Sequence, residues 1–61
     1  MTHYELMTYG KRCFRFDEDE DFASVDELLK AAKDSCDWET FALRCSYFLE
    51  YLAYYADHHR V

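Results

Sequence analysis

The side chains best suited to metal binding or nucleophilic chemistry are three cysteines and three histidines, at widely spaced positions: Cys13, Cys36, Cys45, His3, His58 and His59. A zinc site needs four convergent ligands and usually shows paired spacings, such as two cysteines separated by two residues. No such pair occurs here, and adjacent histidines on a helix point about 100° apart. We therefore expect no metal and no other cofactor.

A cysteine nucleophile with a histidine base is the other chemistry that these residue types allow. Such catalysis needs a pocket, an activated nucleophile and an oriented base. A chain of 61 residues with one glycine has no glycine-rich loop and little length from which to wall a cleft. Cys45 also falls at a helical apolar spacing, where cysteine packs as a small apolar side chain. We expect a protein that is not an enzyme.

The last third of the chain carries the most prominent pattern, a helix that is apolar over most of its circumference. One stripe recurs at alternating steps of three and four: Trp38, Phe41, Cys45, Phe48, Leu52, Tyr55 and His59. A second stripe lies beside it: Leu43, Tyr47, Tyr51, Tyr54 and His58. Such a helix must be covered on more than one side. We expect the first stripe as far as Tyr55, together with Tyr47, Tyr51 and Tyr54, to form a homodimer or partner interface, although the N-terminal segment could also cover the tyrosines.

Tyrosines can also stack on the bases of single-stranded nucleic acid, but that mode of binding needs a basic groove beside them. Only Arg44 and Arg60 lie near the tyrosines in the sequence, and the formal net charge of the chain is −6. Binding to phosphates requires clustered lysine and arginine side chains. We therefore expect no direct binding to nucleic acid.

The strongest local charge feature is a run of five acidic residues, Asp17, Glu18, Asp19, Glu20 and Asp21. It could dock on a basic surface, which would make the chain an acidic inhibitor that occupies the nucleic-acid-binding surface of a host protein. It could equally be a solvated linker that favours the amino end of the next helix. Because the acids are contiguous rather than spread at regular spacing along a face, we favour the linker.

Two antiparallel helices are predicted after this run, at about 24–34 and 37–59. Ser24 and Glu27 have the spacing of a capping box, in which each side chain satisfies a backbone donor at the start of a helix. Val25, Leu28, Leu29 and Ala32 follow at helical spacing. The connector of about four residues, 34–37, is short enough to place the two helices side by side.

The first segment, residues 3–16, fits two structures. As a β-hairpin, two short strands would flank Gly10 and Lys11, because glycine suits the first position of a type II′ turn. As a helix, Thr2 and Glu5 would form a second capping box, but Gly10 in its interior would cost about 1 kcal/mol. We favour the hairpin, which gives a mostly α member of the α+β class, and an all-α fold of three helices is the alternative.

Bulk properties predict a single small domain, 1–61, that associates with itself. A chain this short is marginally stable alone and needs disulfides, a metal or oligomerisation. The cysteines are odd in number and no secretory or membrane-length apolar segment is present, so we expect free thiols, a cytoplasmic location and no membrane. Oligomerisation is the remaining source of stability, and we expect a homodimer.

The whole chain resembles the small accessory proteins encoded between the exonuclease and excisionase genes of lambdoid phages. The opening MTHYELMTYGKRCFRF, the acidic run at 17–21 and the helical remainder carry this resemblance. It implies an early, cytoplasmic protein of the bacterial host that influences phage development through host or phage partners. The resemblance assigns no functional residues.

Overall fold

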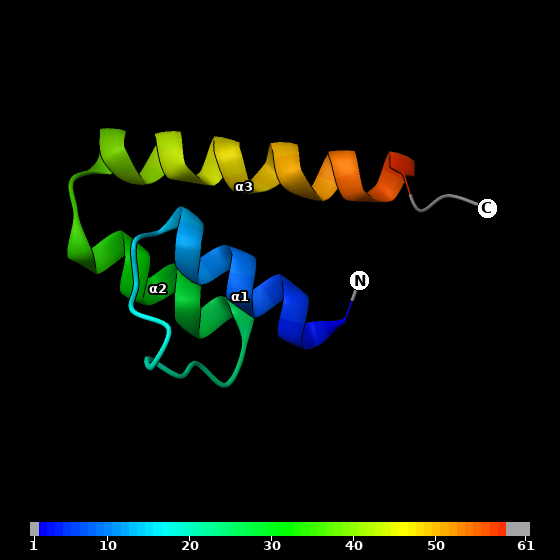
Figure 1. Cartoon of the computed structure of the whole chain (residues 1–61). Helices are drawn as coiled ribbons and strands as arrows, with labels where there is room; N and C mark the ends of the chain where they lie inside the picture. The colour runs from blue at the N-terminus through cyan, green and yellow to red at the C-terminus, as the bar shows by residue number, and fades with distance from the viewer. Residues whose placement is uncertain (1, 59–61) are drawn as a thin grey trace.

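The computed structural model describes residues 2–58, which form three α-helices and no strand. The helices are α1 (His3–Cys13), α2 (Val25–Ser35) and α3 (Trp38–His58). Figure 1 shows α1 and α2 side by side below α3, with α2 and α3 antiparallel. The prediction of a mostly α fold is confirmed, and the all-α alternative fits the structure. His59, the last residue of the predicted long helix, lies outside the described residues.

The predicted β-hairpin at 3–16 is wrong, because α1 occupies this segment. The Thr2 side chain caps the helix by accepting a hydrogen bond from the Glu5 backbone N–H at 3.1 Å. Gly10 lies within α1 and is buried against the other helices rather than at a turn. A Cβ atom placed there would lie 3.2 Å from Leu28 Cδ1 and 3.5 Å from Phe48 Cζ. The glycine therefore allows α1 to approach α2 and α3 closely, a use that the sequence pattern does not reveal.

The turn that follows α1 contains a residue in the left-handed conformation that is not glycine. Arg15 has φ of 65°, a conformation that usually costs a residue with a Cβ atom about 1 kcal/mol or more. The Phe16 N–H donates to the Lys11 carbonyl at 2.9 Å, and the Arg15 N–H donates to the Arg12 carbonyl at 3.3 Å. These two bonds form a Schellman motif, which satisfies carbonyls left free at the end of the helix.

The starts of α2 and α3 follow the sequence closely. Ser24 Oγ accepts from the Glu27 N–H at 3.3 Å, and Glu27 Oε2 accepts from the Ala23 N–H at 2.9 Å. The predicted capping box is thus present, although its second bond reaches one residue further back than the usual pattern. Only Cys36 and Asp37 separate α2 from α3, and both lie within the predicted connector at 34–37.

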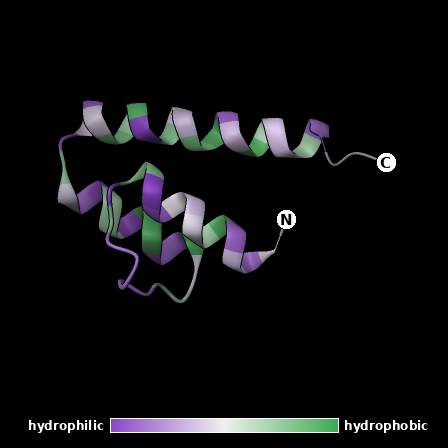
Figure 2. Ribbon diagram, in the orientation of Figure 1, coloured by the Kyte–Doolittle hydropathy of each residue, from purple (hydrophilic) through white to green (hydrophobic). Residues whose placement is uncertain are grey.

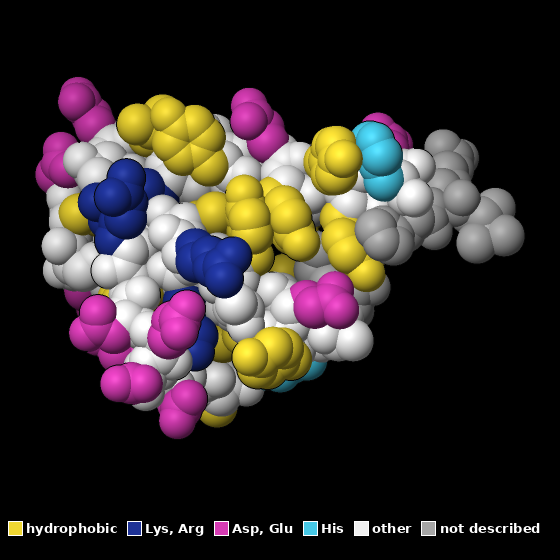
Figure 3. All heavy atoms as spheres, in the orientation of Figure 1, with side chains coloured by type: hydrophobic (Ala, Val, Ile, Leu, Met, Phe, Trp, Pro, Cys, Tyr) yellow, Lys and Arg dark blue, Asp and Glu magenta, His cyan; other side chains and the backbone are white. Residues whose placement is uncertain are grey.

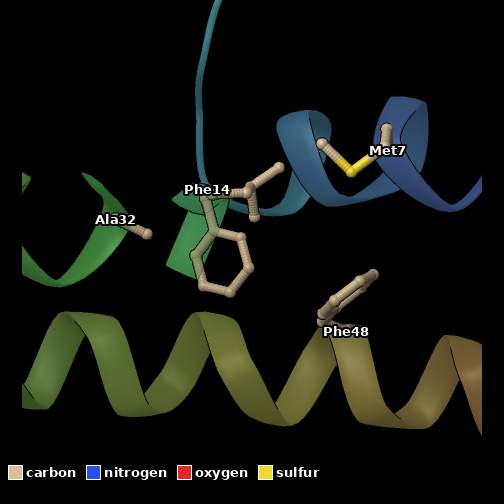
Figure 4. Packing of buried hydrophobic residues seen from close by; sticks show 5 residues of the cluster. Met7, Phe14, Ala32 and Phe48 are labelled. Carbon is tan, nitrogen blue, oxygen red and sulfur yellow. The ribbon is translucent and has the colours of Figure 1, made fainter. Parts of the chain in front are cut away.

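The three helices share one core. The buried hydrophobic side chains are those of Met7, Phe14, Leu28, Ala32 and Phe48. Figure 4 shows Phe14 and Phe48 facing each other between α1 and α3. Their ring centroids are 5.8 Å apart at an interplanar angle of 74°, an edge-to-face contact that aromatic pairs favour. Phe14 follows directly after α1, so the Schellman turn also places the residue at the centre of the core.

The connection between α1 and α2 is held to α1 by one lysine. Lys11 Nζ donates to the backbone carbonyls of Glu18 and Glu20, each at 3.0 Å. The rings of Phe16 and Phe22 pack together with centroids 5.0 Å apart. Figure 2 shows that this connection is hydrophilic over most of its length, in contrast to the mixed colours of α3.

Candidate interaction surface

The structure divides the predicted interface residues of α3 between the core and the surface. Phe48 is buried, and Phe41, Cys45 and Leu52 are half-buried and packed against the core cluster. The middle of the predicted seam therefore faces α1 and α2 of the same chain. Tyr55 is also half-buried.

Several large apolar side chains remain more than half exposed. On α3 they are Trp38, Leu43, Tyr47, Leu49 and Tyr54. Leu43, Tyr47 and Tyr54 share one face at helical spacing, whereas Trp38 and Leu49 lie on another. Tyr4 on α1 is the most exposed of all, at 78%. Tyr4 and Leu49 were not among the predicted interface residues.

The tyrosine face of α3 continues onto α1 through a close ring stack. The ring centroids of Tyr9 and Tyr51 are 3.5 Å apart, with the planes inclined by 13°. Tyr51 is half-buried as a result. Further along α3, Tyr54 stacks on His58 with a centroid separation of 3.8 Å. The predicted tyrosine stripe is thus partly covered by α1, and Tyr47 and Tyr54 remain outside that cover.

Two shallow depressions lie along the edge where α1 meets α3. The larger, of about 380 Å³, is lined by Tyr9, Arg12, Cys13, Arg15 and Tyr47. The smaller, of about 170 Å³, is lined by Tyr4, Glu5, Thr8, Tyr9, Arg12 and Tyr51. Figure 3 shows apolar side chains gathered over this edge, with lysine and arginine side chains directly beside them.

The basic residues at this edge come from α1 and the turn after it. Arg12 and Arg15 are exposed, and neither guanidinium forms a hydrogen bond or ion pair with a described residue. In the sequence, only Arg44 and Arg60 lie near the tyrosines of α3. Arg12 and Arg15 line a depression with Tyr47 because α1 is a helix beside α3, and the predicted hairpin does not reveal this.

Cys13 and Cys45 do not have the lowered pKa of an activated nucleophile. Burial raises the pKa of the Cys13 thiol, and a hydrogen bond with Tyr9 offsets this only in part. Burial also raises the pKa of the Cys45 thiol. A raised pKa reduces the fraction of reactive thiolate at neutral pH. Within residues 2–58, no group of three His, Cys, Asp or Glu side chains is arranged to hold a metal ion.

The acidic run at 17–21 is exposed at all five positions. The two bonds from Lys11 are made to backbone carbonyls of the run and not to its carboxylates. None of the three helices, as far as they are described, is both long enough and apolar enough to cross a membrane.

Comparisons of the chain with protein-family models, with curated proteins and with solved structures found no match. The function must therefore be inferred from the geometry of this surface.

Proposed function

We propose that this chain is a small, acidic, non-enzymatic interaction protein that acts as a homodimer. The observation that carries the proposal is the group of tyrosines along the edge of α1 and α3. Tyr4, Tyr47 and Tyr54 are all more than half exposed, and Tyr9 of α1 stacks on Tyr51 of α3. Contiguous apolar patches on small proteins mark interaction sites. Tyrosine suits such sites because it contributes a large contact area together with a hydroxyl group.

The small core supports self-association as well. Five buried hydrophobic side chains among residues 2–58 make a small core, and the three cysteines are free rather than joined in disulfides. Binding a second copy stabilises the folded state by mass action. Following the resemblance to the lambdoid phage proteins, the proposal extends to a phage-encoded protein that acts early, in the cytoplasm of the bacterial host.

The mass in solution tests this proposal. We expect sedimentation velocity to give a dimer near twice 7.4 kDa, with dissociation only at the dilute end of a hundredfold concentration series. A folded protein that sediments as a monomer throughout this series would refute the homodimer.

A second function, docking of the acidic run on a basic partner, is favoured by the way Lys11 fixes the run. The bonds from Lys11 Nζ to the carbonyls of Glu18 and Glu20 order this backbone, so less conformational entropy is lost on binding. Such a complex should weaken steeply as the salt concentration rises, because exposed charges are screened.

Capture from host lysate at low and high salt tests this second function. A variant in which each acid at 17–21 is replaced by its amide (Asn for Asp, Gln for Glu) should no longer capture any salt-sensitive partner. The matched control neutralises five exposed acids elsewhere: Asp26, Asp34, Glu39, Glu50 and Asp57. Equal loss of the partner in both variants would show that only net charge matters and would exclude a docking role for the run.

A further inference from the structure

The outward side of α1 has a pattern of side chains that is complementary to itself. Thr8 lies midway along it, with Tyr4 and Arg12 each four residues away in opposite directions. Glu5 lies three residues before Thr8, and Lys11 lies three residues after it. Residues three and four apart on a helix are neighbours on one face. An aromatic ring and an acid thus occupy one end of this face. Arg12 occupies the other end, with Lys11 beside it bonded to the carbonyls of Glu18 and Glu20.

Such a pattern is what a two-fold axis requires. In an isologous interface the same surface is used by both copies, so each group must find its complement on the same chain. An axis through Thr8 would set the two α1 helices antiparallel. Arg12 of each copy would then meet Tyr4 and Glu5 of the other, the first by a cation–π contact and the second by a charge-assisted hydrogen bond.

The depressions beside α1 fit the same arrangement. Tyr4, at 78% exposure, stands at the amino end of the face. The depression of about 380 Å³ lies at the other end, between Arg12, Arg15 and Tyr47. Antiparallel pairing carries each Tyr4 ring toward this depression in the other copy, where two guanidinium groups and a tyrosine ring line the surface.

Charge favours a second copy over a nucleic acid as the occupant. Glu5 lines the smaller depression together with Arg12, so a strand of phosphates along this edge would meet a carboxylate. The net charge of −6 repels a polyanion and a second copy alike, so the choice depends on the local complementarity of Glu5 and Arg12. A typical stable interface takes about 800 Å² from each partner. That is about one sixth of the 4724 Å² of surface on this chain.

We propose that two copies of this chain pair across α1, with the two-fold axis at Thr8, so that Tyr4 of each copy enters the depression between α1 and α3 of the other. This proposal rests on the homodimer proposed above and assigns its interface to α1 and the adjoining edge of α3.

Charge reversal tests the pairing. Arg12→Glu places a carboxylate opposite the partner's Glu5 at both ends of the interface, and Glu5→Arg places two arginines together. Because juxtaposed like charges are strongly unfavourable, each variant alone should have a dimer dissociation constant raised by about a hundredfold. An equimolar mixture of the two should dimerise again, because both pairs are then opposite in charge.

The matched control repeats the same changes on α2. Asp26→Arg in its first turn and Lys33→Glu in its last turn disturb the helix dipole in the same way as the α1 variants. Both control variants should dimerise as the wild type does. Tyr4→Ala provides a second test that does not depend on charge. Its side chain is largely exposed, so the fold should be unaffected, and the dissociation constant should rise about tenfold or more.

The outcomes separate the two proposals. A wild-type dimer with both charge variants still dimeric would overturn the α1 interface and leave the homodimer standing. A wild-type monomer at every concentration would overturn both. In that case, binding of fluorescent oligothymidylate or of an oligoglutamate peptide, lost in Arg12→Glu, would assign the face to a different partner.

Discussion

Replacement of Gly10 by alanine sets helix propensity against core packing, and the structure indicates which effect is larger. Alanine in a helix interior is favoured over glycine by about 1 kcal/mol. The new Cβ atom, however, would lie 3.2 Å from Leu28 Cδ1 and 3.5 Å from both Leu28 Cδ2 and Phe48 Cζ. Leu28 is 1% exposed and Phe48 is 5% exposed, so neither side chain can move outward freely.

Overpacking a core typically costs about 1–3 kcal/mol, so the net effect should be a loss of about 1 kcal/mol in the free energy of unfolding. For a domain of this size, such a loss lowers the melting temperature by about 4–8 °C. Thermal and urea unfolding followed by circular dichroism, at one fixed protein concentration, would measure the change. The fixed concentration matters because dimerisation makes stability depend on concentration.

The same substitution in a Leu28→Val variant tests whether the contact with Leu28 causes the loss of stability. Leu28→Val removes the δ-methyl groups that the new Cβ atom would approach. In this background, Gly10→Ala should instead raise the free energy of unfolding by up to about 1 kcal/mol, because only helix propensity remains. If Gly10→Ala raises the melting temperature of the wild type, the close approach of α1 to Leu28 is not a constraint and the reasoning fails.

Three further variants test the core, the end of α1 and the start of α3. Phe14→Ala should cost about 3–5 kcal/mol, most of the roughly 3–9 kcal/mol expected for a chain of this length. Retention of cooperative unfolding near the wild-type midpoint would contradict the position of Phe14 in the core. Arg15→Gly should raise the free energy of unfolding by about 1 kcal/mol, since glycine adopts φ of 65° without strain; a lower urea midpoint would argue against the left-handed turn. The pKa of Asp37 is lowered, and a hydrogen bond from the Thr40 side chain is the largest cause. The ionised Asp37 carboxylate therefore stabilises the fold at neutral pH, and this stabilisation is lost as the pH falls through the pKa that Asp37 has in the folded state. Asp37→Asn should flatten the acid side of the stability profile, and an unchanged profile would remove this role.

The sequence was sufficient for the helices whose local chemistry agrees with their tertiary role. Ser24 and Glu27 mark the start of α2 by hydrogen bonds within one turn, so no knowledge of distant residues is required. The apolar repeat of α3 similarly depends only on helical periodicity. Gly10 and Arg15 are different. The value of a missing Cβ atom at Gly10 depends on Leu28 and Phe48, and an arginine in the left-handed region has no local sequence preference to reveal it.

For the same reason, the sequence predicts only the α3 part of the candidate surface. The tyrosines of α3 were identified by their spacing, and Tyr47 and Tyr54 are exposed as a free interface requires. The contributions of Tyr4 and Arg12 depend on α1 being a helix that runs beside α3. Once residues 3–16 were assigned to a hairpin, neither residue could be placed next to Tyr47 or Tyr51.

The most direct test of the proposed dimer is an isotope-filtered nuclear Overhauser measurement on a mixture of labelled and unlabelled chains, which detects only contacts between copies. We expect contacts between the Tyr4 ring and the side chains of the partner's Cys13 and the partner's Tyr47. Contacts between copies confined to Trp38 and Leu49, or no contacts between copies at concentrations well above those of the sedimentation series, would contradict pairing across α1.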